Sequence, residues 1–152
     1  MGLDMYLYKK NYIWQGEWVK PEIKQEVLVK KGGDVDTTIK PNRVKYVVEE
    51  VGYWRKANQI HNWFVDNVQD GKDECQESYV SREKLEELLG ICRIVKIDKR
   101  KAEQLLPTQS GFFFGSTGYD EYYYQDIDNT IEILEEALSD ESADDFAYRA
   151  SW

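Results

Sequence analysis

Residues 107–124 have the sequence PTQSGFFFGSTGYDEYYY, and our prediction of the fold starts from this stretch. Three consecutive phenylalanines, residues 112–114, predict a short buried strand. The Gly-Ser-Thr-Gly segment after them predicts a tight turn, and a helix is expected to begin near Asp120. Because ligand pockets combine an apolar floor with a few polar groups at the rim, the stretch indicates a binding site.

The overall composition indicates one globular domain. The chain has 152 residues, of which 41% are hydrophobic and 32% are charged. These values are typical of a folded soluble protein of single-domain size. We therefore expect a single domain over residues 1–152.

The net charge of the chain indicates which classes of partner molecule it can bind. The formal net charge is −9. Because nucleic-acid binding depends on Lys and Arg side chains that neutralise phosphates, we expect no nucleic-acid partner. An acidic surface suits a basic partner protein, or simply keeps the protein soluble.

The two cysteines, Cys75 and Cys92, are too few for a disulfide framework. A reducing cytoplasm is therefore the expected location. The sequence contains no leader-like segment and no apolar run of membrane-spanning length, so we expect no membrane partner. Association into a homo-oligomer stays open.

Three segments in the first third of the chain have the character of strands. Leu3, Met5 and Leu7 alternate with other residues, which predicts a strand with one buried face. Residues 25–31 and residues 44–51 are rich in valine and predict two more strands.

Turns and loops are expected between and after these strands. Residues 11–24 predict a loop with exposed aromatic rings, and Gly32-Gly33 predicts a turn. Residues 34–43 are polar and are expected to form a mobile loop. Residues 140–145 predict a solvated linker, which leads into an edge strand over residues 146–152.

Three helices are expected in the remainder of the chain. The first covers residues 54–68, with Gln59 on its solvent face. The second follows the N-cap Ser81, and we favour one continuous helix over an alternative that ends at Leu89 and continues as a strand. The third covers residues 121–139. A small mixed or antiparallel sheet packed against about three helices defines an α+β layer architecture.

The Gly-Ser-Thr-Gly segment before the last helix has the outline of an anion-binding turn, because free backbone N–H groups and a helix N-terminus attract negative charge. It lacks the lysine of a phosphate-binding loop, and Asp120 would repel an anion placed on the helix end. A plain turn and a ligand rim both remain open for this segment.

His61 is the only histidine, at the edge of an apolar helix face. It is interpreted as a half-buried histidine with satisfied hydrogen bonds, or as a general base that needs an orienting partner. A Cys–His pair with Cys75 or Cys92 lacks a nucleophile signature, and the spacings do not form a zinc site. We assign no catalytic residue, no metal site and no cofactor.

The helix after residue 53 supplies cationic, amide and aromatic groups that could face the aromatic stretch. Cations neutralise a phosphate, and rings stack on a base. The predicted ligand-binding residues are Trp54, Arg55, His61, Asn62, Ser116, Thr117 and Tyr119.

Three segments carry a resemblance to a known family. They are YWRKANQIHNWFVDNVQDGKDEC (53–75), YVSREKLEELL (79–89) and LLPTQSGFFFGSTGYDEYYYQDIDNTIEIL (105–134). The chain resembles a family of small, mostly uncharacterised proteins encoded by tailed bacteriophages and prophages. The resemblance implies an accessory phage protein in a bacterial cytoplasm, of the kind that often counters host defence. It implies no catalytic residues.

Three hypotheses for the function follow. The leading one is a non-catalytic protein that sequesters a small nucleotide-derived molecule, such as a host-defence signal, in an aromatic pocket with a polar rim. The second is an acidic protein inhibitor of a host enzyme or nucleic-acid-binding protein. The third is a small hydrolase that uses His61.

Overall fold

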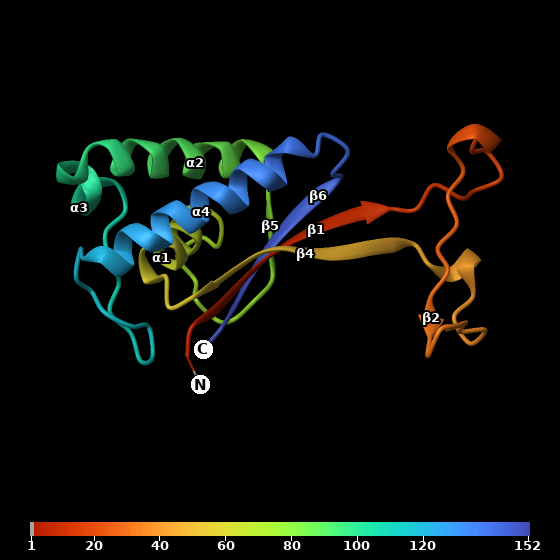
Figure 1. Ribbon diagram of the computed structural model, residues 1–152, viewed down its shortest axis with the longest axis horizontal. Coiled ribbons are helices and arrows are strands. Elements are labelled where there is room, and N and C mark those ends of the chain that lie inside the picture. Colours follow the sequence, from red (N-terminus) through yellow and green to blue (C-terminus); the bar gives the residue numbers. More distant parts are fainter. Residues whose placement is uncertain (1) are drawn as a thin grey trace.

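Helices cover one face of an antiparallel sheet, which gives the fold its two layers (Figure 1). The computed structural model describes residues 2–152, and within them four strands run in the order β4-β1-β6-β5. The strands are β1 (Asp4–Tyr12), β4 (Tyr46–Arg55), β5 (Ser78–Val80) and β6 (Asp145–Ser151). The helices are α1 (Asn58–Asn67), α2 (Arg82–Ile97), α3 (Ala102–Leu105) and α4 (Glu121–Ser139). The predicted α+β class is confirmed.

The strand predicted at the beginning of the chain forms the centre of the sheet. Leu3, Met5 and Leu7 are fully buried in one core cluster with helix residues such as Leu134. Tyr6 lies on the opposite face of the sheet, since successive side chains of a strand point to opposite sides. The period-two alternation therefore identified the buried face correctly.

The last strand is not an edge strand, as the sequence suggested, but an interior one. β6 pairs with β1 on one side and with β5 on the other, and both pairings are antiparallel. Phe146, Tyr148 and Ala150 point into the core, with exposed fractions of 3% or less. The alternation of apolar and polar residues predicted the strand itself. It could not predict the position of the strand in the sheet, because both neighbouring strands are more than 60 residues away in the sequence.

The first helix begins later than predicted, at Asn58, because β4 continues to Arg55. The predicted helix residues Trp54 and Arg55 therefore belong to a strand. Lys56 separates the two elements, with a positive φ of 57°, and its N–H donates to the Leu3 carbonyl at 2.8 Å. A left-handed residue ends a strand and redirects the chain, which amino-acid periodicity does not reveal.

The other two helices begin at their predicted positions because their N-caps are local. The Ser81 hydroxyl accepts a hydrogen bond from the Lys84 N–H, and α2 continues past Gly90 to Ile97 as one helix. The Asp120 carboxylate accepts from the Tyr123 N–H at the start of α4. These side chains satisfy backbone donors that a helix start otherwise leaves free.

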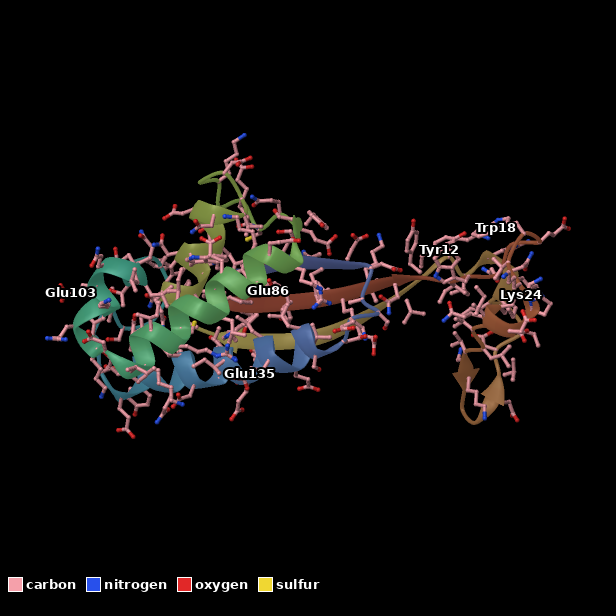
Figure 2. The ribbon with its side chains drawn as sticks, turned by 90° about the horizontal axis from the view of Figure 1, so that it is seen from above. Tyr12, Trp18, Lys24, Glu86, Glu103 and Glu135 are labelled. Carbon is pink, nitrogen blue, oxygen red and sulfur yellow. The ribbon has the colours of Figure 1, made fainter. Side chains whose placement is uncertain are left out.

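Residues 13–45, called the arm below, project away from the rest of the chain, called the body (Figures 1 and 2). The arm contains the short hairpin of β2 (Lys30–Lys31) and β3 (Asp34–Val35), with the 3₁₀ helices η1 (Pro21–Ile23) and η2 (Pro41–Arg43). The predicted turn at Gly32-Gly33 joins the hairpin. The strand predicted over residues 25–31 is wrong except for its last two residues, because no sheet lies beside it.

Candidate functional site

The stretch that the sequence analysis singled out is a loop, not a strand and turn. Phe112 is 82% exposed and Phe113 42% exposed, so the expected buried strand at 112–114 is wrong. Phe114 alone is buried, against the edge of His61. A run of three apolar residues does not specify which of them meets the core.

Asn58, the first residue of α1, fixes this loop to the body. Its amide nitrogen donates to the carbonyls of Phe114 and Ser116 at 3.0 and 2.9 Å, and its oxygen accepts from the Gln109 N–H at 2.9 Å. Asn58 is 1% exposed. Because buried amide groups are costly when unpaired, this residue holds the loop in one path.

Gly115 allows the loop to pass close to the end of β4. Its φ is +88°, and a Cβ atom on it would lie 3.1 Å from the Lys56 Cβ. Both the backbone conformation and the close approach favour glycine at this position. The loop is thereby held against the side of the β4–α1 junction.

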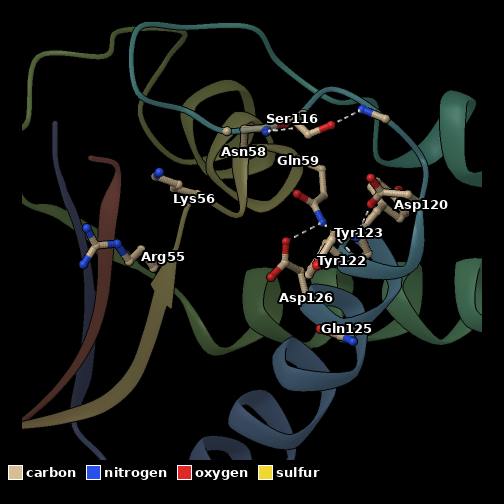
Figure 3. Close-up of a pocket in the computed structure, with 12 residues that line it drawn as sticks. Arg55, Lys56, Asn58, Gln59, Ser116, Asp120, Tyr122, Tyr123, Gln125 and Asp126 are labelled. Carbon is tan, nitrogen blue, oxygen red and sulfur yellow. Dashed lines mark hydrogen bonds between the residues drawn. The ribbon is translucent and has the colours of Figure 1, made fainter. Parts of the chain in front are cut away.

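A cavity of about 390 Å³, called the polar cavity, opens between this loop, α1 and the start of α4 (Figure 3). Its lining includes cations from the β4–α1 junction, amides from α1 and carboxylates from α4. These residues are Arg55, Lys56, Asn58, Gln59, Asp120 and Asp126. Figure 3 shows Arg55 and Lys56 on one side and Asp126 with Gln59 on the other. Its volume is within the range of small-molecule sites.

The carboxyl group of Asp126, which lines the polar cavity, has a raised pKa. Burial raises the pKa of Asp126 to about 6; the Gln59 hydrogen bond lowers this pKa, and the charge of Asp120 raises it. Gln59 donates through its amide nitrogen to the Tyr123 carbonyl at 3.2 Å and to Asp126 at 3.4 Å. A partly desolvated carboxylate in a cavity favours a ligand that brings hydrogen-bond donors.

A second cavity of about 450 Å³, called the aromatic cavity, lies between α1, the same loop and the end of β6. The rings of Phe112, Phe114 and Trp152 contribute to its lining. Its charged groups are Asp66 and Asp73, and no Lys or Arg lines it. The charge of this cavity therefore disfavours a phosphate.

His61 lies at the back of the aromatic cavity with both ring nitrogens engaged. Burial, followed by the charge of Asp73, raises the pKa of Tyr148 well above its usual value, so the phenol stays protonated. With the ring proton of His61 on Nε2, the Tyr148 hydroxyl donates to Nδ1 at 2.7 Å and Nε2–H donates to Asp73 at 2.9 Å. The side chain of His61 is only 1% exposed. The interpretation as a satisfied histidine fits this geometry.

Cys92 is not suited to act as a nucleophile. Burial raises the pKa of the Cys92 thiol to about 12, which keeps it protonated and unreactive. Among residues 2–152, no group of His, Cys, Asp and Glu side chains has the geometry to hold a metal ion.

The structure divides the predicted ligand-binding residues between different cavities. Arg55 and Ser116 line the polar cavity. His61 and Asn62 line the aromatic cavity. The sequence predicted that the first helix and the loop meet, which they do, but they enclose two spaces instead of one.

Three other predicted residues do not line either cavity. Trp54 is 1% exposed, and its Nε1–H donates to the Thr130 hydroxyl at 2.8 Å, so it fills the core instead of the rim. The Thr117 carbonyl accepts from the Thr108 hydroxyl, and the Tyr119 hydroxyl accepts from the Thr108 N–H. Tyr119 and Thr117 therefore support the loop, although Tyr119 also lines a shallow hollow with Lys99.

Several residues of the polar cavity were not predicted as ligand-binding residues. Lys56 and Asn58 neighbour the predicted residues, and Gln59, expected on the solvent face of its helix, is 2% exposed. The one feature of the sequence that could have indicated these residues is the cluster of polar residues near the start of the helix. Asp126 carries no such signal, because only the fold brings α4 beside α1.

The comparisons with known proteins leave the site to be interpreted from its chemistry. No family model, no curated protein and no solved structure matches this chain. No helix within residues 2–152 is both long and apolar enough to span a membrane.

Proposed function

We propose that the chain binds a small nucleotide-derived molecule in the polar cavity, without chemical conversion of it. The observation that supports this proposal is the separation of charge across one cavity. Arg55 and Lys56 lie on one side, and the Asp126 carboxylate lies on the other with the amide of Gln59 (Figure 3).

This separation suits a molecule with a phosphate at one end and a base at the other. The cations would neutralise the phosphate, and Arg55 would do so with a planar guanidinium. The carboxylate of Asp126 would accept from an exocyclic amino group of the base. Tyr122 lines the cavity and is 73% exposed, so its ring is available to stack on a base.

From the resemblance to phage-encoded proteins, we propose that this binding takes place in a bacterial cytoplasm. A chain that holds a nucleotide signal without hydrolysing it would lower the free concentration of that signal. Sequestration of a host-defence signal is therefore the role that we propose for the binding activity.

Isothermal titration tests the proposal with cyclic mononucleotides, cyclic dinucleotides, linear dinucleotides, ADP-ribose and adenosine. We expect at least one phosphate-bearing compound to bind, and adenosine to bind about tenfold more weakly or not at all, because it lacks a phosphate. The bound compound should be recovered intact by chromatography. Absence of binding heat across the whole panel would overturn the proposal.

Matched variants locate the site within the molecule. Arg55→Gln and Lys56→Gln keep part of the aliphatic stem and remove the charge, so each should weaken binding about tenfold. Asn62→Ala changes the aromatic cavity and should leave the affinity unchanged. Equal losses in all three variants would contradict binding in the polar cavity.

The two alternative functions receive less support from the geometry. A hydrolase that uses His61 needs a ring nitrogen that can reach water or substrate, whereas Asp73 and Tyr148 occupy both nitrogens. For an acidic inhibitor, some of the carboxylates of α4 and of the segment after it are already paired, since Glu135 pairs with Arg93 at 2.8 Å and Asp140 with Lys9 at 2.6 Å.

A further inference from the structure

β4 is a sheet edge with one side unpaired. It pairs with β1 and with no other strand among residues 2–152. The Ile13 N–H donates to the Lys45 carbonyl at 2.9 Å, directly beyond the last register pair of the ladder. Hydrogen-bonded and non-hydrogen-bonded pairs alternate along an antiparallel ladder. The backbone groups of Tyr46, Val48 and Glu50 therefore point away from β1.

The side chains on this edge leave it accessible. Tyr46 is 50% exposed and Val48 is 56% exposed. The register between β1 and β4 is regular from Tyr46 to Glu50, and the irregularity comes only after this segment. An accessible edge with free backbone groups is a template for pairing with another strand.

The arm extends from the same end of β4 and exposes much apolar surface. Only Ile13 and Val19 are buried in the arm. Seven of its large apolar side chains are exposed, namely Trp14, Trp18, Ile23, Leu28, Val29, Val35 and Ile39. Exposed apolar side chains concentrated in one projecting segment indicate an interaction surface.

The arm and the body differ in the sign of their charge. Residues 13–45 contain seven Lys and Arg against five Asp and Glu, a net charge of +2. The remainder of the chain contains thirteen basic and twenty-four acidic residues, a net charge of −11. Because salt screens charges beyond about 8 Å, the charges that face each other in a contact decide its electrostatics. The net charge of the arm is therefore opposite in sign to that of the body of another copy.

We propose that two copies of this chain associate through their β4 edges, antiparallel and around a two-fold axis at Val48. The two four-stranded sheets then form one continuous sheet. A two-fold interface brings the same surface of both copies together, so Val48 faces Val48 and Tyr46 faces Glu50. These residues carry the outward backbone groups, so their N–H and C=O groups pair across the axis.

This register places the arm of each copy beside the body of the other. Lys45 falls opposite Val51 of the second copy and diagonal to its Glu49, on the same face of the sheet. Glu49, Glu50, Glu136 and Asp140 line an acidic hollow of about 490 Å³ between β4 and α4, together with Lys9. The exposed apolar groups of the arm continue past the second copy's Val51 toward its Arg55, because β4 leads directly into the arm (Figure 1).

A charge-swap pair tests the axis. Val48→Lys and Val48→Asp each place two like charges opposite one another, because Val48 faces its own copy. Each variant alone should dimerise at least about tenfold more weakly than the unmodified chain in analytical ultracentrifugation, and an equimolar mixture should regain dimers. Recovery on mixing also shows that both variants are folded. A mixture that stays monomeric overturns the proposed axis.

A second experiment distinguishes the contribution of the β4 edge to dimerisation from that of the arm. Replacement of residues 14–44 by Asn-Gly joins the hydrogen-bonded pair of Ile13 and Lys45 with a two-residue hairpin turn. We expect this variant to dimerise about tenfold more weakly than the full chain, because only the edge contact remains. Undiminished dimerisation overturns the role of the arm. A full chain that is monomeric at about 100 μM overturns the whole proposal, and the exposed arm then serves another protein.

Discussion

The body and the arm bury their apolar residues to opposite extents. In the body, Phe64 stacks on Tyr148 with ring centroids 3.9 Å apart, and both side chains are fully buried. In the arm, Trp18 is 69% exposed although it also contacts another ring, that of Trp14. Aromatic content alone therefore does not indicate a core, because the same residue types serve packing in one region and exposure in the other.

The two regions also differ in the range of the interactions that hold them. The arm is held by contacts among its own residues, such as the Asp36 carboxylate that accepts from the Thr38 N–H and the Gln15 amide that donates to the Val44 carbonyl. A proline stands at the start of both of its 3₁₀ helices. The body depends on contacts between distant residues, such as Trp54 with Thr130. The stability of the molecule should thus reside in the body, and four measurements challenge or refine that contrast.

The largest effect is expected from Phe64→Ala. Loss of a fully buried ring that stacks on Tyr148 should lower the free energy of unfolding by about 3–5 kcal/mol. Trp18→Ala, the matched change in the arm, should cost no more than about 1 kcal/mol, because most of this ring already contacts water. Urea unfolding measures both values. Equal costs would mean that the arm contributes to the folded core.

Asn58→Ala should have the next largest effect. It leaves the carbonyls of Phe114 and Ser116 and the N–H of Gln109 without their partner. We expect a loss of about 2–3 kcal/mol in the free energy of unfolding and faster amide exchange at Gln109. Asn62→Ala on the same helix is the control and should change the stability by less than about 0.5 kcal/mol. Unchanged exchange in the Asn58 variant would show that another contact holds the loop.

Asp126→Asn should stabilise the body at neutral pH. The folded pKa of Asp126, about 6, exceeds the ordinary value of 3.8, so the folded state binds the proton more tightly than the unfolded state. The free energy of unfolding therefore falls as pH rises from about 4 to about 6. Because the carboxyl is only partly buried, the substitution should add about 1–2 kcal/mol at pH 7 and nothing below pH 4.

Two further observations distinguish this effect from general acid sensitivity. Asp128 lies on the same helix as Asp126 and forms an exposed ion pair with Lys96 of α2. Asp128→Asn should therefore change the stability by less than about 1 kcal/mol. The hydrogen bonds from Lys9 and Ser142 lower the pKa of Asp140 to about 2, so its contribution is lost only as pH falls from about 4 toward 2. If the stability difference between Asp126→Asn and the unmodified chain were constant with pH, it would contradict a raised pKa of Asp126 as the cause.

The smallest effect on stability is expected from removal of the arm. With residues 14–44 replaced by Asn-Gly, the free energy of unfolding of the monomeric body should change by no more than about 1 kcal/mol, because the core lies outside the arm. Urea unfolding at low protein concentration measures this value. Unfolding of the body on removal of the arm would show that the arm supports the sheet.

Much of the fold was predictable because its signals are local. The alternation of Leu3, Met5 and Leu7 predicted the central strand, and the caps Ser81 and Asp120 predicted where α2 and α4 begin. The candidate site was predictable only as a neighbourhood. Arg55 and Ser116 line the polar cavity, but Asp126 joins them only through the packing of α4.

By itself, the sequence determined the α+β class, the residues at which α2 and α4 begin and the buried face of β1, because caps and periodicity act within a few residues. Only the tertiary structure decided that Phe112 is exposed while Phe114 is buried, and that β6 lies inside the sheet. It also decided that one predicted pocket is two cavities. The physical reason is that burial depends on partners distant in the chain, and neither composition nor spacing specifies which partners meet.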